Sequence, residues 1–237
     1  MENKEIITKL HGLVAAYNMP DRAKRALTSG KIMVLCGVTA SGKNKLADYL
    51  ISHGSYDNVV SHTTRKPREN RGVPEQNGVE YWFVQPEEMV EMIEQEQFIE
   101  VKSIHGDTCY GTTIAAAESV LERGKKAIMV VDVQGALELA EIVPQLQPIF
   151  LLPPSYEIWM ERLGFRGDIS DGEKHRRMRS ASMEIQVALD HRQFLIAVNH
   201  EVEITAAEIM TGMDSRSSSQ ESNRKLAMEF LDTLRQM

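Results

Sequence analysis

The segment GVTASGKNK, residues 37–45, has the glycine and lysine spacing of a phosphate-binding loop. Gly37 and Gly42 permit a tight turn in which backbone N–H groups point inward at phosphate oxygens. Lys43 places a positive charge on the outer phosphates, where charge develops during phosphoryl transfer. The apolar run KIMVLCG before the loop indicates a buried strand, and a helix is expected after it, which is the setting such a loop requires. The segment therefore predicts a nucleotide site.

Asn44 departs from the loop pattern, because Ser or Thr normally follows the lysine. A hydroxyl oxygen at this position binds Mg²⁺, and the carbonyl oxygen of an amide is also an oxygen ligand. Alternatively, phosphate oxygens and waters hold the Mg²⁺, and Asn44 caps the helix expected from there to about His53. A third reading is that catalysis has been lost.

A second group of anion-binding side chains lies in SHTTRKPR, residues 61–68. Arg65 and Arg68 are three residues apart and are preceded by Ser and Thr hydroxyls. Guanidinium groups match the geometry of a phosphate with paired hydrogen bonds, so the segment suits a small anion clamp. Taken alone, its composition favours a solvated basic face.

Composition limits the classes of function. The chain has 237 residues, enough for one domain with an inserted lobe or for two small domains, and a net charge of −7 from 27 basic and 34 acidic residues. An acidic chain is poorly suited to non-specific nucleic-acid binding. Cys36 and Cys109 have no metal-type spacing and fit a reducing cytoplasm. With no membrane-span pattern and no signal-peptide pattern, a cytoplasmic location is expected.

The rest of the chain predicts an α/β fold, because apolar strands alternate with amphipathic helices. Residues 2–27 are expected to form two helices broken at Met19–Pro20, and VEYWFV at Val79–Val84 is expected to be a strand. The stretch from about 59 to 112 is more β-rich and indicates an inserted lobe. TGMDSRSSSQESNRK, residues 211–225, is expected to be a polar linker before a closing amphipathic helix.

The order of motifs resembles the guanylate kinase family. The phosphate loop is followed by VSHTTRKPR, GVEYWFV, FIEV, HGDTCYGTT, VVDVQGALEL, FLLPPS, RLGFRG and the pair Val198-Asn199. The resemblance implies a P-loop three-layer α/β core with a parallel sheet, an inserted small β-rich GMP-binding lobe and a helical lid. It implies a guanylate kinase-like domain at 31–209 (core 31–58 and 113–209, lobe about 59–112, lid about 162–180). The expected N-terminal helical extension at 1–30 and the Ser-rich linker with a C-terminal helix at 210–237 have no assigned counterpart in the family.

The resemblance also implies roles for individual residues. Those matching the ligands of ATP are Gly37, Ala40, Ser41, Gly42, Lys43, Asn44, Lys45, Arg162 and Asn199. Those matching the ligands of the GMP phosphate are Arg65, Arg68, Tyr81 and Tyr110, and those matching the guanine-reading positions are Ser61, Glu100, Thr112 and Asp132. The catalytic set is Lys43, Arg166 and Arg177. Guanine offers N1–H and an exocyclic amine, which suit carboxylates, whereas adenine lacks that pair of donors.

Two positions near the expected metal depart from the family, since Val130 stands where an acid is common and Asn44 replaces Ser or Thr. The segment between Arg68 and Tyr81 is also longer than usual. The leading hypothesis is phosphorylation of GMP by ATP with Mg²⁺, in one direct in-line step. The alternatives are a non-catalytic nucleotide- or protein-binding module of the same fold and a P-loop kinase with another phosphorylated acceptor. The expected partners are ATP and GMP, with no nucleic acid and no membrane, and the oligomeric state stays open.

Overall fold

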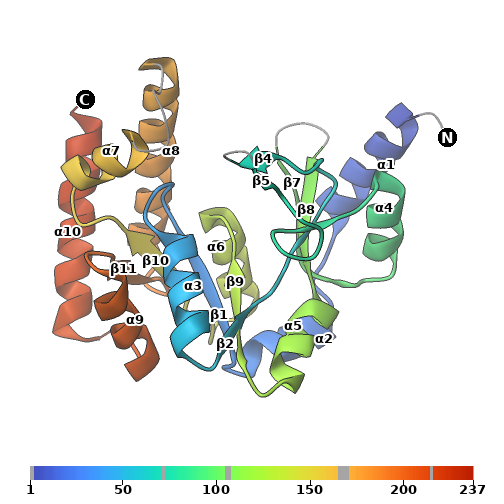
Figure 1. Ribbon diagram of the computed structural model, residues 1–237, viewed down its shortest axis with the longest axis horizontal. Helices are drawn as coiled ribbons and strands as arrows, with labels where there is room; N and C mark the ends of the chain where they lie inside the picture. The colour runs from blue at the N-terminus through green and yellow to red at the C-terminus, as the bar shows by residue number, and fades with distance from the viewer. Residues whose placement is uncertain (1–2, 71–72, 105–107, 165–170, 214–215, 237) are drawn as a thin grey trace. The chain divides into compact units, whose positions relative to one another are not determined.

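The computed structural model of the chain describes residues 3–70, 73–104, 108–164, 171–213 and 216–236 (Figure 1). Its helices are α1 (Asn3–Ala16), α2 (Asp21–Thr28), α3 (Lys43–His53), α4 (Pro86–Glu94), α5 (Ile114–Glu122), α6 (Val133–Ile142), α7 (Tyr156–Gly164), α8 (Asp171–Asp190), α9 (Val202–Thr211) and α10 (Ser218–Arg235). Its strands are β1 (Ile32–Gly37), β2 (Tyr56–Asn58), β3 (His62–Thr63), β4 (Glu69–Asn70), β5 (Val73–Pro74), β6 (Trp82–Phe83), β7 (Phe98–Ile104), β8 (Thr108–Thr113), β9 (Lys126–Val130), β10 (Ile149–Leu152) and β11 (Leu195–Val198).

A five-stranded sheet has the strand order β11-β10-β1-β9-β2. β1 pairs in parallel with β10, and β10 pairs in parallel with β11, with Leu35 opposite Ile149 and Ile149 opposite Leu195. β10 and β11 are buried along their whole length, as expected for parallel strands covered on both faces. The predicted α/β class with a parallel sheet is confirmed.

The chain divides into two compact units. The first unit, residues 1–32 and 57–129, is called the N-terminal unit, and the second, residues 33–56 and 130–237, is called the C-terminal unit. Helices α1 and α2 group with the stretch that contains the predicted GMP-binding lobe. The domain boundaries drawn from the sequence stay a prediction.

The N-terminal unit contains a four-stranded sheet with the order β6-β3-β8-β7, in which β8 is antiparallel to both β3 and β7. The expected strand at Val79–Val84 is reduced to Trp82–Phe83, which is β6. Gly78 has a φ of +81°, and the N–H of Val79 donates to the carbonyl oxygen of Gln76 at 3.1 Å, so a turn occupies the first part of that stretch.

In the C-terminal unit, α3 packs against α9, while α8 packs against α6 and α10. The predicted linker is wrong from residue 218 onward, because α10 begins at Ser218. The Ser217 hydroxyl accepts a hydrogen bond from the N–H of Gln220 and caps the helix. The serine-rich segment therefore contains the start of a helix. The sequence analysis also did not anticipate α9.

Gln220 connects α10 to the outer strand β11. Its side-chain oxygen accepts from the N–H of Ile196 at 2.9 Å, and its Nε2 donates to the carbonyl oxygen of Ile196 at 2.9 Å. The side chain of Asn223 donates to the same carbonyl at 2.8 Å. An amide side chain here takes the place of a neighbouring strand for Ile196, which fixes the position of the C-terminal helix.

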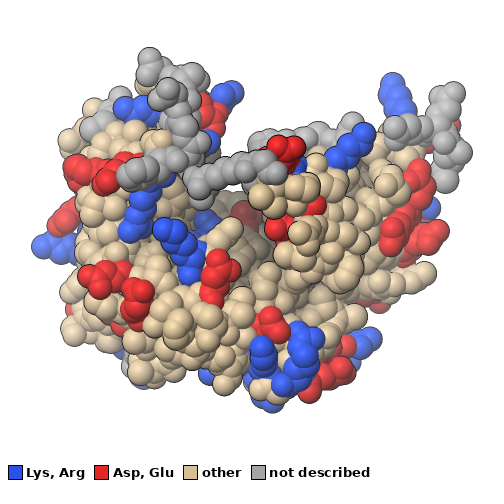
Figure 2. Space-filling view, in the orientation of Figure 1, with Lys and Arg blue, Asp and Glu red and all other residues tan. Residues whose placement is uncertain are grey.

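The surface charges and the two cysteines can be placed on the structure. Acidic and basic side chains are interspersed over the surface that Figure 2 displays. Cys36 and Cys109 are both buried and both free thiols. In the described ranges, none of the helices has the length and apolar character needed to cross a bilayer.

Candidate functional site

The phosphate loop follows β1 and has the backbone that its glycines permit. Gly37 has a φ of +139° and Gly42 a φ of +97°. A Cβ on Gly37 would overlap the carbonyl oxygen of Leu151 in β10, and a Cβ on Gly42 would overlap the side-chain amide of Asn199. Both positions therefore require glycine for conformation and for space. Ala40 also has a positive φ, of 63°.

Lys43 lies across the loop that precedes it. Its Nζ donates to the carbonyl oxygens of Gly37 at 2.6 Å and of Val38 at 3.0 Å. The loop thus wraps around the ammonium group and holds it at the start of α3. This is the arrangement in which a lysine can neutralise the phosphates of a nucleotide bound to the loop amides.

Three predicted ATP ligands meet at Ser41. The carbonyl oxygen of Ser41 accepts from Asn199 Nδ2 at 2.8 Å and from Arg162 Nη1 at 3.4 Å, and Arg162 Nη2 donates to the carbonyl oxygen of Asn199 at 3.0 Å. Ser41 is fully buried, and within the described residues its hydroxyl oxygen has no hydrogen-bond partner. An orphaned buried hydroxyl in a phosphate loop is a donor available to a ligand.

Asn44 does not cap the following helix, so the predicted capping role is wrong. Helix α3 begins at Lys43, and Gly42 occupies the N-cap position. Asn44 and Lys45 are exposed in the first turn of the helix. The cap is displaced because Gly42, with its positive φ, makes the sharp change of direction between loop and helix.

The lid arginines are described only in part. Arg166 lies outside the described residues. Arg177 in α8 donates from Nε to Glu173 Oε1 at 2.8 Å, and its Nη1 is buried without a partner in the described part of the chain. Arg176, which is exposed, pairs with the other oxygen of Glu173 at 2.8 Å. Glu173 therefore holds Arg177 within one helix and leaves part of its guanidinium group unsatisfied.

Glu184 is a residue that the sequence analysis missed. Burial raises the pKa of this α8 carboxyl to about 7, while Lys43 lowers its pKa and Asp132 raises it. These charges act on one another near the phosphate loop of the C-terminal unit. A carboxyl that titrates near neutrality is typical of functional sites as well as of buried ion networks. Its position in a long amphipathic helix gave no local signal in the sequence.

In the N-terminal unit, the predicted guanine-reading residues of β7 and β8 lie together. Thr112 donates from Oγ1 to Glu100 Oε1 at 2.7 Å, and the hydroxyls of Thr112 and Ser61 are 3.0 Å apart. Glu100 stands directly opposite Thr112 in the antiparallel register. The hydroxyls orient the carboxylate, so this row can present fixed acceptors to a base that carries adjacent N–H donors.

The predicted phosphate ligands of the same unit also gather around one side chain. Arg65 donates from Nε to the hydroxyl of Tyr110 at 3.1 Å, and its guanidinium carbon lies 5.3 Å from the centre of the Tyr81 ring. The rings of Tyr81 and Tyr110 are 5.6 Å apart. Burial raises the pKa of Tyr81, and the charge of Arg68 lowers it. Arg68 itself is exposed.

Glu75 is the second residue that the sequence analysis missed. Its carboxylate accepts from Nη1 and Nη2 of Arg65 at 2.8 and 3.1 Å, and from the backbone N–H of Arg68 at 2.8 Å. The hydrogen bond to Glu75 raises the pKa of Arg65. The unusually long segment between Arg68 and Tyr81 was the available signal, because an acid inside it lies near two arginines in sequence.

Asp132 belongs to the C-terminal unit, whereas Ser61, Glu100 and Thr112 belong to the N-terminal unit. Its Oδ1 accepts from the N–H of Gly135 at 2.7 Å and caps α6. A structural role thus accounts for one carboxylate oxygen of this exposed side chain. A guanine-reading role for Asp132 stays a prediction.

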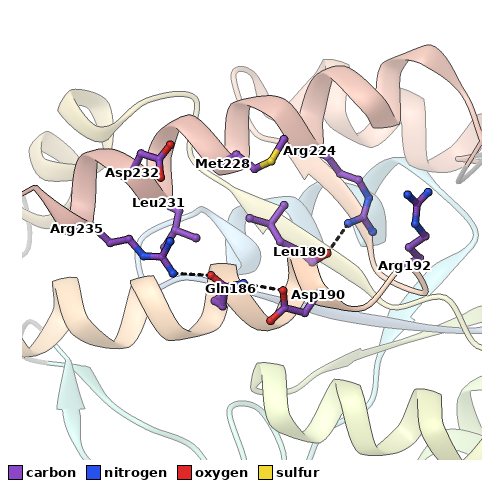
Figure 3. A pocket seen from close by; sticks show the side chains of 9 residues that line it. All are labelled: Gln186, Leu189, Asp190, Arg192, Arg224, Met228, Leu231, Asp232 and Arg235. Atoms are coloured by element: carbon purple, nitrogen blue, oxygen red, sulfur yellow. Dashed lines mark hydrogen bonds between the residues drawn. The ribbon is translucent and has the colours of Figure 1, made fainter.

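A hollow of about 480 Å³ lies between α8 and α10 of the C-terminal unit (Figure 3). Four of its polar side chains bind one another or the backbone. Arg235 donates to Gln186 at 2.6 Å, Gln186 donates to Asp190 at 2.6 Å, and Arg224 donates to the carbonyl of Phe194 at 2.8 Å. The hollow is a packed helix–helix groove, and none of the predicted site residues lines it.

Comparisons with known proteins identify the family of the chain. The family model described as guanylate kinase matches residues 29–216. A guanylate kinase of Clostridioides difficile (strain 630) is 35% identical over 181 residues, which cover 76% of this chain and 85% of that protein. One from Haemophilus influenzae (strain 86-028NP) is 33% identical over 202 residues, covering 84% and 94%. The crystal structure of guanylate kinase from Anaplasma phagocytophilum superposes with a TM-score of 0.55 at 25% identity, covering 86% of this chain and 88% of that one. The chain therefore belongs to the guanylate kinase family.

Proposed function

We propose that this chain transfers the γ-phosphoryl group of ATP to GMP, giving ADP and GDP. The observation that carries this proposal is the combination, in one chain, of a lysine-bearing phosphate loop and a hydrogen-bonded row of Ser61, Thr112 and Glu100. The first suits the donor nucleotide, and the second suits a base with adjacent N–H donors. Family membership supports the same reaction.

The guanine end of the site rests on Glu100. Its carboxylate accepts from N1–H and from the exocyclic amine of guanine, while Thr112 and Ser61 keep it in place. Asp132 is proposed as the second acceptor. Adenine presents no such pair of donors and would leave the acid without partners, so AMP is a poor acceptor.

The phosphate of GMP is proposed to bind Arg65, Arg68, Tyr81 and Tyr110. Arg65 Nε already donates to the Tyr110 hydroxyl at 3.1 Å, so the two side chains lie together before a ligand arrives. Two guanidinium groups and two phenol hydroxyls neutralise and orient a phosphate dianion. Orientation matters because in-line transfer depends mainly on positioning and on charge neutralisation.

The triphosphate of ATP is proposed to bind the amides and side chains of the phosphate loop. Lys43, together with Arg166 and Arg177, stabilises the charge that develops on the transferring group. The remaining proposed ATP ligands are Gly37, Ala40, Ser41, Gly42, Asn44, Lys45, Arg162 and Asn199. Arg162 and Asn199 act by holding the backbone of Ser41.

The residues present fit Mg²⁺ as a cofactor. Mg²⁺ is usually held by one or two protein ligands with phosphate oxygens and waters, and the described residues contain no cluster of three or more His, Cys, Asp or Glu suited to a metal. Asn44 is exposed in the first turn of α3 and is not engaged as a cap, so its amide oxygen is available as one ligand. Held there, Mg²⁺ would neutralise negative charge on the phosphates of the donor nucleotide.

The test is ADP release from ATP and GMP, measured for the wild type and for Lys43→Ala over a titration of Mg²⁺ and of Mn²⁺. Lys225→Ala is the matched control, since Lys225 is an exposed lysine in α10 whose partner Glu229 is 3.9 Å away. Wild type and control are expected to turn over GMP at equal rates, and Lys43→Ala is expected to lose at least about a hundredfold in kcat.

The outcomes separate the alternatives. Absence of GMP-dependent turnover by a folded wild-type chain at every metal concentration would contradict the proposal. Saturable GMP binding without turnover would favour a binding module. Faster turnover of another phosphorylated acceptor than of GMP would favour a kinase with a different substrate.

A further inference from the structure

The N-terminal helices lie outside the part of the chain that the family model matches, which begins at residue 29. They are nevertheless part of the core of the N-terminal unit. Ile6 and Leu10 of α1 are 2% and 0% exposed and pack with Met89 of α4 and Phe98 of β7. The apolar face of α1 is therefore covered by α4 and by β7, the strand that carries Glu100.

Tyr17, just after α1, makes the most specific of these contacts. Its hydroxyl donates to the carbonyl oxygen of Phe98 at 2.7 Å and accepts from the N–H of Phe98 at 3.1 Å. The two rings meet edge to face, with centroids 6.5 Å apart. One hydroxyl thus satisfies both backbone groups of a single strand residue.

Phe98 needs such a partner because of its place in the sheet. β7 is the outer strand of the order β6-β3-β8-β7, so backbone groups on its outer edge face away from the sheet. The register of β7 against β8 also shifts between Phe98 and Glu100: Phe98 stands opposite Thr113, and Glu100 stands opposite Thr112. Ile99 is therefore the extra residue of a β-bulge.

The bulge determines where Glu100 points. Successive side chains of a strand alternate between faces, so one extra residue changes the face on which every later side chain lies. With the bulge, Glu100 reaches Thr112 at 2.7 Å. Without it, Glu100 would leave this row of hydroxyls. Bulges commonly re-aim a side chain in this way beside functional sites.

We propose that Tyr17 is a positioning residue for guanine recognition, because its hydroxyl holds the backbone of Phe98 at the bulge that directs Glu100. This inference rests on the proposed function, in which Glu100 reads the guanine base. Tyr17 thereby contributes to substrate selectivity from outside the region shared with the family model. The contact runs through the backbone, so Tyr17 does not touch the nucleotide.

The expected signature is a loss of selectivity for GMP over IMP. Guanine offers the carboxylate N1–H and the exocyclic amine, whereas the hypoxanthine base of IMP offers only N1–H. A paired interaction needs closer alignment of the two carboxylate oxygens than a single hydrogen bond does. Loss of the fixed position of Glu100 therefore weakens the binding of GMP more than the binding of IMP.

The test compares Tyr17→Phe with wild type. Phenylalanine keeps the ring against Phe98 and removes only the hydroxyl. We expect kcat/KM for GMP to fall about tenfold through KM, with kcat and the KM for ATP changed less than about twofold. For IMP, kcat/KM is expected to fall less than about threefold, so the GMP/IMP ratio drops.

Tyr49→Phe is the matched control, because Tyr49 lies in α3 of the C-terminal unit and stacks on His53. It is expected to keep the wild-type GMP/IMP ratio. Thermal unfolding of each variant shows whether the chain is folded at the assay temperature. A stability loss alone would lower the amount of active protein and so reduce kcat for both substrates equally.

An unchanged GMP/IMP ratio in folded Tyr17→Phe would overturn the inference, as would equal losses for GMP, IMP and ATP. A wild type without GMP turnover would instead count against the proposed function. In that case the affinities of Tyr17→Phe and of wild type for GMP and for IMP are compared by calorimetric titration. Equal GMP affinities for Tyr17→Phe and wild type, or no GMP binding by either, would overturn the inference.

Discussion

Glu75 holds the guanidinium group of Arg65 through two hydrogen bonds, of 2.8 Å to Nη1 and 3.1 Å to Nη2. The two side chains are only 8% and 10% exposed. The cation proposed to bind the GMP phosphate is thus fixed by an acid before substrate binds. The ion pair partly neutralises the positive charge of Arg65, and it fixes the orientation of the guanidinium plane.

Neutralising Glu75 is expected to destabilise the fold, because it leaves Arg65 buried without its anionic partner. We expect Glu75→Gln to lower the free energy of unfolding by about 2–3 kcal/mol. The change is measured by urea unfolding, with Glu229→Gln in the exposed pair on α10 as control, for which about 0–0.5 kcal/mol is expected. The double variant Glu75→Gln/Arg65→Met should recover part of the loss, and strictly additive effects would contradict the coupling.

Gly42→Ala is expected to damage the phosphate loop beyond ordinary backbone strain. Gly42 has a φ of +97° and its added Cβ would meet the amide of Asn199, whereas Gly212 has a φ of +95° with nothing within 4 Å. Both substitutions should cost about 1 kcal/mol from the positive φ, and Gly42→Ala should cost more. ATP affinity, measured by calorimetry, should fall only for Gly42→Ala. Equal behaviour of the two variants would argue against the close approach of Asn199.

Glu184 is expected to make stability depend on pH. Its pKa rises from 4.5 to about 7 on folding, so between these values the native state binds a proton that the unfolded state has released. The stabilising contribution is complete below pH 4.5 and is lost as the pH rises through about 7.

Glu184→Gln should remove that loss and be more stable than wild type at pH 8 by about 2–3 kcal/mol, with little difference at acid pH. The measurement is urea unfolding of both proteins from pH 5 to 8. Glu208→Gln, at an exposed position of α9, serves as the control and should follow the wild-type curve. Parallel curves for Glu184→Gln and wild type would refute the shift.

Asn44→Ser is expected to lower the Mg²⁺ concentration that the reaction requires. A hydroxyl at the first turn of α3 is a better fitted ligand for Mg²⁺ than an amide oxygen. The Mg²⁺ concentration for half-maximal GMP-dependent ADP release should fall about three- to tenfold, with the KM for GMP unchanged. Asn58→Ser in β2 is the control. A wild-type metal response in the Asn44→Ser variant would remove Asn44 from the metal site.

Local patterns were sufficient for most elements of this fold. The helix break at Met19–Pro20, the buried strand before the phosphate loop and the parallel α/β class depend on neighbouring residues or simple periodicity. The helix start at Ser218 was hidden because serine suits both linkers and N-caps. Likewise, a turn at Gly78 interrupts the alternating residues 79–84.

The site was predicted less completely, because its contacts join residues distant in sequence. The residues of the phosphate loop share one segment, so their chemistry follows from spacing. Tyr17 and Phe98 are 81 residues apart, and Glu75 reaches Arg65 across the β4–β5 hairpin. Contacts between such distant residues depend on how the segments fold together, and residue spacing in the sequence does not reveal them. The roles assigned by family resemblance remain predictions for the experiments above.

The pairing of Gln220 with Ile196 has a consequence for solubility. β11 is the terminal strand of the five-stranded sheet, and an open terminal strand is a template for pairing with another chain. The side chains of Gln220 and Asn223 occupy the backbone groups of Ile196 that such a chain would use. The C-terminal helix therefore acts as a guard against edge-to-edge self-association, and a chain shortened before Ser217 should be prone to aggregate.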